Sequence, residues 1–162
     1  MVKLMGFTLG ASLSVGFVYT SHVGGSATAL GAHVRVVVPV TGELSVSPSN
    51  EVIEVPAMMA GGENAEAVVT VRNKTGVVRD LVPRAEVTSP DMLELLQLRL
   101  QADGETIFDG SLNELTRGAD ALTVESGESL ELHILTWIDP SSGRASVGRN
   151  ADVTLHFAMD GS

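Results

Sequence analysis

The chain has 162 residues and a formal net charge of −10, from 10 Lys and Arg against 20 Asp and Glu. This acidic balance argues against nucleic-acid binding, because such binding draws its affinity from Lys and Arg that neutralise phosphates. Cysteine is absent, which excludes disulfides, Fe–S clusters, thiol nucleophiles and Cys-ligated zinc. The length fits one domain that is preceded by a leader.

The N-terminal region has the layout of a secretory leader. Lys3 precedes an apolar stretch over residues 4–18, and Ala27-Thr28-Ala29 fits the small-residue pattern of a signal-peptidase site. The sequence therefore predicts a signal peptide at residues 1–29. The mature protein would begin at Leu30 and would be extracellular or attached to the cell surface.

Three other interpretations of this region stay open. One is a buried N-terminal helix, although the Gly and Ser content gives poor helix propensity. A retained transmembrane anchor needs about 20 continuous apolar residues, whereas this stretch is shorter and is interrupted by Gly and Ser. The string Gly6-Phe7-Thr8-Leu9 is typical of a type IV prepilin cleavage site, but Ala11 stands where pilins carry glutamate. Export with cleavage is the favoured interpretation.

Alternating apolar and polar residues dominate from residue 33 onward, and this period of two predicts β-strands. The longest expected strands cover residues 33–40, 65–73, 77–88, 130–137 and 151–157. Turn residues separate about eight such segments, and almost no helix is expected. The pattern predicts an all-β, jelly-roll-like β-sandwich that forms a single domain after the leader.

The segment from Met92 to Gln101 is compatible with helix or strand. Asp103-Gly104 follows it, and this dipeptide between apolar runs is a strong signal for a β-hairpin. We therefore expect a hairpin whose second strand covers residues 105–108. One short helical turn is expected after Ser111, because Glu114 three residues later completes a capping box.

Candidate residues for catalysis or ligand binding are few. His33, His133 and His156 lack close metal-ligand spacing, although His133 and His156 lie on the last two long strands, where they could be neighbours. No G-x-S-x-G motif and no Gly-rich phosphate loop occurs. We expect a protein that is not an enzyme, with no catalytic, cofactor-binding or metal residues and no cofactor.

The predicted mature chain keeps three aromatic residues, Phe108, Trp137 and Phe157. Each lies on an apolar strand or hairpin. We expect all three in the core rather than on a stacking platform for sugars or single-stranded nucleic acid.

From residue 64 onward the sequence resembles the TasA/camelysin family of secreted bacterial and archaeal matrix-fibre proteins. The resembling elements are Asn64-Ala65, Val69-Thr70-Val71-Arg72-Asn73, Leu98-Arg99-Leu100, Asp103-Gly104, Phe108-Asp109-Gly110-Ser111-Leu112-Asn113-Glu114-Leu115, Val124-Glu125-Ser126-Gly127-Glu128-Ser129-Leu130, Trp137, and Asn150 before the final strand. The leader departs from the family, because it lacks an aromatic-rich processing junction.

The resemblance implies a jelly-roll subunit that polymerises outside the cell with copies of itself, into filaments or biofilm-matrix fibres. Subunits of such fibres are joined by donor-strand complementation, in which the N-terminal strand of one subunit fills a groove in the next. Residues 33–40 are the candidate donor, since Val34, Val36, Val38 and Val40 alternate as β-augmentation requires. An ordinary first strand in its own domain is an equally weighted alternative.

Two other functions stay open at this point. One is a monomeric secreted module for adhesion or binding. The other is a camelysin-type metalloprotease, which would need a zinc site that the sequence does not supply. Contact with a membrane is expected only transiently, during export.

Overall fold

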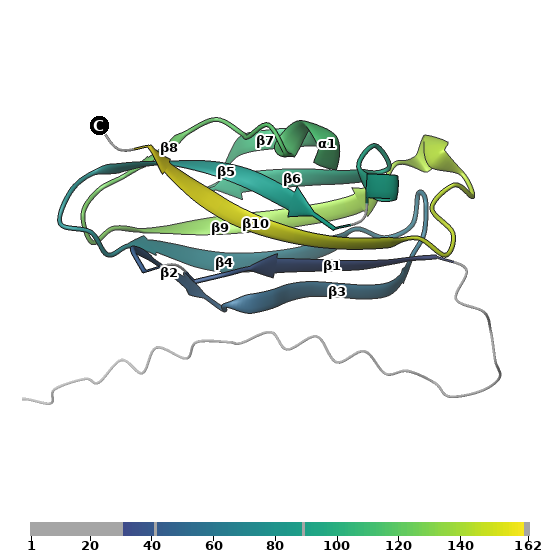
Figure 1. Cartoon of the computed structure of the whole chain (residues 1–162), viewed down its shortest axis with the longest axis horizontal. Coiled ribbons are helices and arrows are strands. Elements are labelled where there is room, and N and C mark those ends of the chain that lie inside the picture. The colour runs from purple at the N-terminus through teal and green to yellow at the C-terminus, as the bar shows by residue number, and fades with distance from the viewer. Residues whose placement is uncertain (1–30, 41, 89, 161–162) are drawn as a thin grey trace, which may run out of the picture.

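The alternating segments fold into ten strands that pack as two five-stranded sheets (Figure 1). The computed structural model describes residues 31–40, 42–88 and 90–160, and of residues 159–160 only the backbone. The prediction of an all-β sandwich with almost no helix is confirmed. The predicted signal peptide at residues 1–29 lies outside the described residues.

Each sheet has its own order of strands. Sheet A runs β3 (Asn50–Met58), β1 (Ala32–Val38), β10 (Asn150–Asp160), β5 (Arg79–Val87) and β8 (Leu122–Val124). Sheet B runs β2 (Leu44–Ser47), β4 (Ala65–Asn73), β9 (Ser129–Ile138), β6 (Leu96–Ala102) and β7 (Glu105–Ser111). Short helical segments are α1 (Leu112–Leu115) and the 3-10 turns η1 (Pro90–Met92) and η2 (Pro140–Ser142).

The eight strands from β3 to β10 divide four and four between the sheets, which is the strand number of a jelly roll. β2 adds a short edge strand to sheet B. β1 is inserted inside sheet A, where it separates β3 from β10. It pairs with β10 in parallel and with β3 antiparallel, whereas every other named strand pair is antiparallel.

The core lies between the sheets and is built by the inward half of each alternating strand. β6 illustrates the rule: its leucines are buried while Gln97, Arg99 and Gln101 alternate with them on the outer face. The segment that was compatible with helix or strand is therefore a strand. It begins at Leu96, since residues 93–95 form the turn after η1.

The predicted hairpin and helix cap are both confirmed. Asp103 and Gly104 adopt φ angles of 48° and 86°, as a two-residue turn with two left-handed positions requires. At the start of α1, the Ser111 hydroxyl accepts a hydrogen bond from the Glu114 amide, and the Glu114 carboxylate accepts one from the Ser111 amide.

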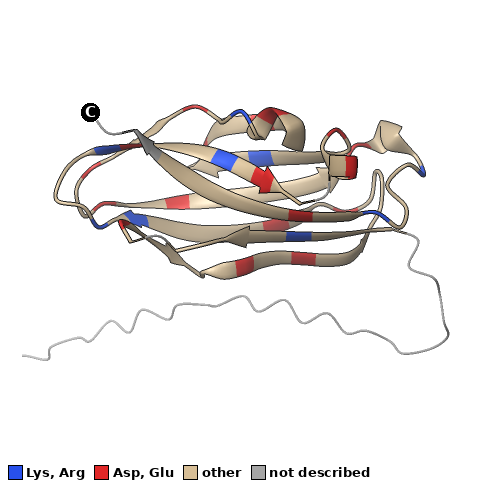
Figure 2. Cartoon of the chain, in the orientation of Figure 1, with Lys and Arg blue, Asp and Glu red and all other residues tan. Residues whose placement is uncertain are grey.

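Charged side chains lie on the outer faces and at the ends of the sandwich. Lys and Arg are interspersed with Asp and Glu along the strands (Figure 2). Pro83 lies on β5 beyond the residues that pair with β8, so the strand is an edge there on one side. This placement fits the rule that proline in a sheet occurs at edges.

Candidate functional site

The predicted polymerisation strand is β1, an interior strand of sheet A that lies between β3 and β10. Val34, Val36 and Val38 are completely buried between the sheets. Val40 was expected on the same face, but half of its surface is exposed. The reason is local, because β1 ends at Val38 and Pro39 follows it.

Ion pairs join the outer face of β1 to both neighbouring strands. Arg35 Nε lies 3.0 Å from Asp152 Oδ1 on β10, and Arg35 Nη1 lies 3.8 Å from Glu51 Oε2 on β3. His33 Nε2 lies 3.5 Å from Glu54 Oε1. These side chains are partly exposed, so each pair contributes at most about 1 kcal/mol. Burial of each valine contributes about 1.5–3 kcal/mol and therefore dominates.

The two ends of β1 are attached differently. Gly31 packs against the end of β3, where an added Cβ would lie 2.5 Å from the carbonyl carbon of Ala57. Only glycine fits this approach. At the other end a five-residue connection, residues 39–43, leads to β2 in the opposite sheet, and a Cβ at Gly42 would meet nothing within 4 Å.

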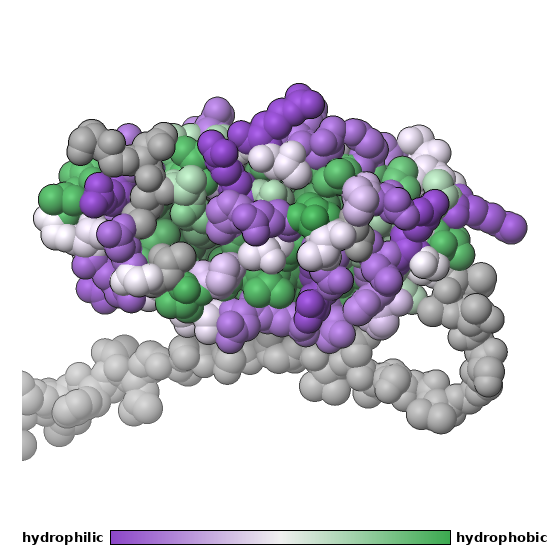
Figure 3. Space-filling model, in the orientation of Figure 1, coloured by the Kyte–Doolittle hydropathy of each residue, from purple (hydrophilic) through white to green (hydrophobic). Residues whose placement is uncertain are grey.

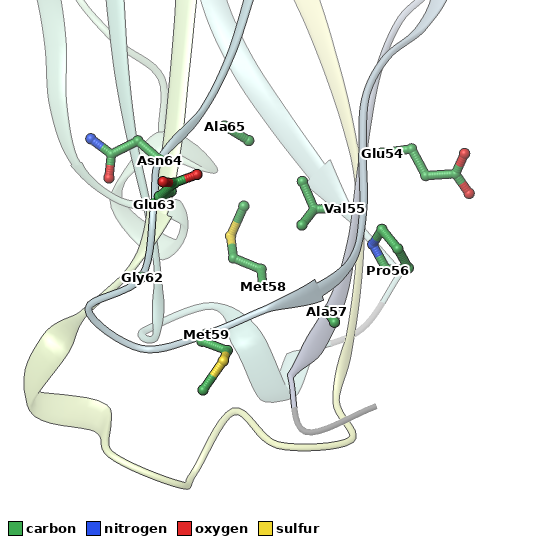
Figure 4. A pocket seen from close by; sticks show the side chains of 10 residues that line it. All are labelled: Glu54, Val55, Pro56, Ala57, Met58, Met59, Gly62, Glu63, Asn64 and Ala65. Atoms are coloured by element: carbon green, nitrogen blue, oxygen red, sulfur yellow. The ribbon is translucent and has the colours of Figure 1, made fainter. Parts of the chain in front are cut away.

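An apolar groove of about 700 Å³ lies between the ends of β3 and β4. Residues 54–59 and 62–65 line it, and we call it the β3–β4 groove. Val55, Met58 and Ala65 project into the space between the two strands, whereas Glu54 and Met59 point away from it (Figure 4). Glu63 lies at its β4 side.

The groove exists because the strands around it stop short. β2 pairs only with residues 70–73 of β4, so on that side residues 65–69 have no partner strand. β3 is likewise an edge of sheet A. The side chains of β4 nearest the groove, Ala65 and Ala67, are small and half-buried, and they leave space that valine or leucine would fill.

At the opposite end of β4, the β4–β5 loop (residues 74–78) is fixed by one buried amide. Asn73 is completely buried. Its Nδ2 donates to the carbonyl oxygens of Val77 (2.9 Å) and Val124 (3.0 Å), and its Oδ1 accepts from the amide and hydroxyl of Thr75. The Ser126 hydroxyl donates to the Thr75 carbonyl. This network holds Val77 and Val78 exposed at the tip.

A histidine between two carboxylates lies on the outer face of sheet B. His133 Nε2 lies 2.9 Å from Glu131 Oε1, and Nδ1 lies 3.5 Å from Glu66 Oε1. The hydrogen bond to Glu131 raises the pKa of His133 above its ordinary value, with a smaller contribution from Glu66, while partial burial opposes the shift.

His133 and His156 are not neighbours, contrary to the sequence expectation. β9 belongs to sheet B and β10 to sheet A, and both imidazoles face outward, away from the core. In residues 31–40, 42–88 and 90–160 no group of three His, Asp or Glu side chains is arranged to hold a metal ion. No helix in those same ranges is long and apolar enough to cross a membrane.

The expectation for the aromatic residues was correct only in part. Phe157 is buried, but Phe108 and Trp137 are half-buried. Trp137 lies between the inward residues Thr136 and Ile138 of β9 and therefore faces outward. The Arg99 guanidinium lies 5.8 Å from the centre of the Trp137 ring, in the range of a cation–π contact.

No protein-family model matches the chain, and no curated protein matches it. The resemblance to matrix-fibre proteins therefore stays a prediction from the sequence.

Sequence reasoning missed both the β3–β4 groove and the fixed loop at the other end of β4. The groove depends on where β2 ends, which no local pattern encodes. A weak signal for the loop was present, since Asn73 follows the apolar alternation at a position that would otherwise point inward.

Replacing Asn73 by Ala should destabilise the fold by about 1–3 kcal/mol, because the carbonyl groups of Val77 and Val124 lose a buried donor. Asn73→Asp should be at least as damaging, since it keeps the acceptor for Thr75 but faces both carbonyls with a carboxylate. Urea denaturation followed by Trp137 fluorescence measures this. The exposed Asn64→Ala is the control and should change stability by less than about 0.5 kcal/mol.

Charged His133 should stabilise the protein most in mild acid. Its raised pKa makes this contribution fully present below the unfolded value of 6.5, and the contribution is lost as the pH rises through the higher folded pKa. His133→Gln should therefore cost more stability at about pH 5.5 than at about pH 8, by less than about 1 kcal/mol because the pair is exposed. Glu131→Gln should remove most of this difference, and equal costs at both pH values would contradict the assignment.

Proposed function

We propose that the chain is an exported, non-enzymatic structural subunit that assembles with copies of itself into extracellular filaments or matrix fibres. In this proposal β1 of one subunit occupies the place between β3 and β10 of the next, as donor-strand complementation requires. The observation that carries it is the position of β1, an added strand inserted inside an otherwise complete set of eight.

The contacts of β1 suit exchange between copies. Its three buried valines and its ion pairs to Glu51 and Asp152 involve residues that every copy presents in the same place. An exchanged strand would make the same contacts in its partner. Exchange therefore changes the contact free energy of the strand little. Swapping an identical element is for this reason a low-cost route to oligomers.

The chain connections of β1 also permit exchange. β1 is the first strand of the described residues, and predicted cleavage after Ala29 would leave two residues ahead of it. A single connection, residues 39–43, holds it to the rest of the fold. An extended chain covers at most about 3.6 Å per residue, so the six steps from Val38 to Leu44 span at most about 22 Å. In an exchanged pair, Val38 lies in the acceptor subunit and Leu44 in the donor subunit. The two subunits must therefore bring these two residues within that distance.

The sequence resemblance to matrix-fibre proteins supports the same proposal, since it implies extracellular polymerisation. The acidic surface supports it differently. Charged side chains on strand faces and edges oppose indiscriminate edge pairing, so assembly through one defined strand remains possible without general aggregation.

Electron microscopy of the protein secreted by an exporting host tests assembly directly, and we expect filaments from a chain whose N-terminus is Leu30. A cysteine pair tests exchange. Arg35 and Asp152 are register partners on β1 and β10, and the chain contains no cysteine. When Arg35→Cys protein assembles together with Asp152→Cys protein, a disulfide between the two chains should form, because neighbouring strands bring their Cα atoms within disulfide range.

The control mixes Arg35→Cys with Val68→Cys, which lies in the other sheet and should not cross-link. Filaments without the 35–152 disulfide would refute exchange of β1 but not assembly. A protein that stays monomeric at high concentration would refute assembly and favour a secreted binding module. Cleavage of casein that EDTA stops would favour a metalloprotease.

A further inference from the structure

The exposed apolar side chains gather at the two ends of the sandwich. Among the described residues, six large apolar side chains are exposed: Val40, Met59, Val68, Val77, Val78 and Val147. All except Val68 lie at an end. Figure 3 shows apolar surface at the left tip of the molecule, where the β4–β5 loop lies in Figure 1.

The two ends are joined by β4 and differ in shape. The β3–β4 groove lies where β4 begins, and the β4–β5 loop lies where it ends. The eight steps between the first and last of the nine residues of β4, at about 3.4 Å each, place them roughly 27 Å apart. One end is therefore a hollow with an apolar lining, and the other is a projecting loop with two exposed valines.

We propose that the β4–β5 loop of one copy docks into the β3–β4 groove of a second copy, to give a head-to-tail contact along the strand direction. The groove volume of about 700 Å³ lies within the range of about 300–1,000 Å³ that is typical of pockets for drug-sized ligands, which is enough for the side chains at the tip of a loop. Val77 and Val78 supply apolar surface to match Val55 and Ala65, which are partly exposed in the groove.

Charge favours this pairing over the two symmetric ones. Lys74 lies in the loop, and Glu63 lines the groove. Loop against groove brings these opposite charges together. Loop against loop would oppose Lys74 to Lys74, and groove against groove would oppose Glu63 to Glu63 across two hollows.

Hydrogen bonds also hold the loop backbone before it binds. The Asn73 amide fixes the carbonyl of Val77 and the backbone of Thr75, so little conformational freedom remains to be lost on docking. Such preorganisation raises affinity because ordering a flexible loop costs free energy.

A contact between two different surfaces of the same molecule generates an open chain when the rotation between copies does not close a ring. It uses the β4–β5 loop, which takes no part in the proposed exchange of β1. The docking contact therefore adds a second contact between copies to the proposed assembly and does not require exchange.

Cross-linking tests the geometry on the mature chain. Ala57 lines the groove and is exposed, as is Val77 in the loop. The double variant Ala57→Cys/Val77→Cys should form a ladder of disulfide-linked oligomers, since the two sites in one chain are too far apart to bond. The matched control Val68→Cys/Val77→Cys, with Val68 exposed in the middle of β4, should not. Equal ladders, or linkage of Val77→Cys to itself in the single variant, would overturn the proposal.

Sedimentation velocity tests the energetics. Val77→Asp/Val78→Asp should raise the concentration for half-association at least tenfold, with an unchanged circular dichroism spectrum, and Val68→Asp should not. Glu63→Lys and Lys74→Glu should each weaken association, and the two together should restore it. Association unaffected by the loop variants would refute docking, while the 35–152 disulfide test for exchange of β1 would stand separately.

Discussion

The structure depends on the burial of one row of valines. β1 places Val34, Val36 and Val38 between the sheets, and it lies between β3 and β10, the first and last of the eight jelly-roll strands in chain order. Without β1 these two strands have no hydrogen-bonding partner on their facing sides, and the core loses three completely buried side chains. Among the described strands, β1 is also the first in the chain, and one connection joins it to the strand that follows.

Self-association would use surfaces that the fold has left incomplete. β2 is short and leaves part of β4 without a neighbour, and β3 is an edge, so an apolar groove opens between them. The opposite end has no such gap, because the Asn73 side chain makes hydrogen bonds with the Thr75 amide and the Val77 carbonyl of the β4–β5 loop. A hollow end and a projecting end on one molecule are a physical basis for polarity in an assembly, independent of how β1 is placed.

Local signals predicted the fold well where one chemical rule acts alone. Asp103-Gly104 specified the hairpin, since few dipeptides tolerate two left-handed positions, and Ser111 with Glu114 specified the start of α1. Predictions that needed two distant strands were weaker. His133 and His156 were expected as possible neighbours, but their strands lie in different sheets. Trp137 was expected in the core, but it lies on the outward side of β9. Leu135 lies on that same side. Because both sides of the strand carry apolar residues, the sequence pattern does not reveal which side faces the core.

The sequence by itself determined the fold class, the hairpin, the helix cap and which side of most strands faces inward, because each follows from a period or a dipeptide read locally. Only the tertiary structure decided that β1 lies parallel to β10, that Val40 is exposed beyond Pro39, and that a groove and a fixed loop occupy opposite ends of β4. These features depend on which strands become neighbours and where each stops. That choice is made by packing between residues far apart in the chain, such as Val36 and Val153.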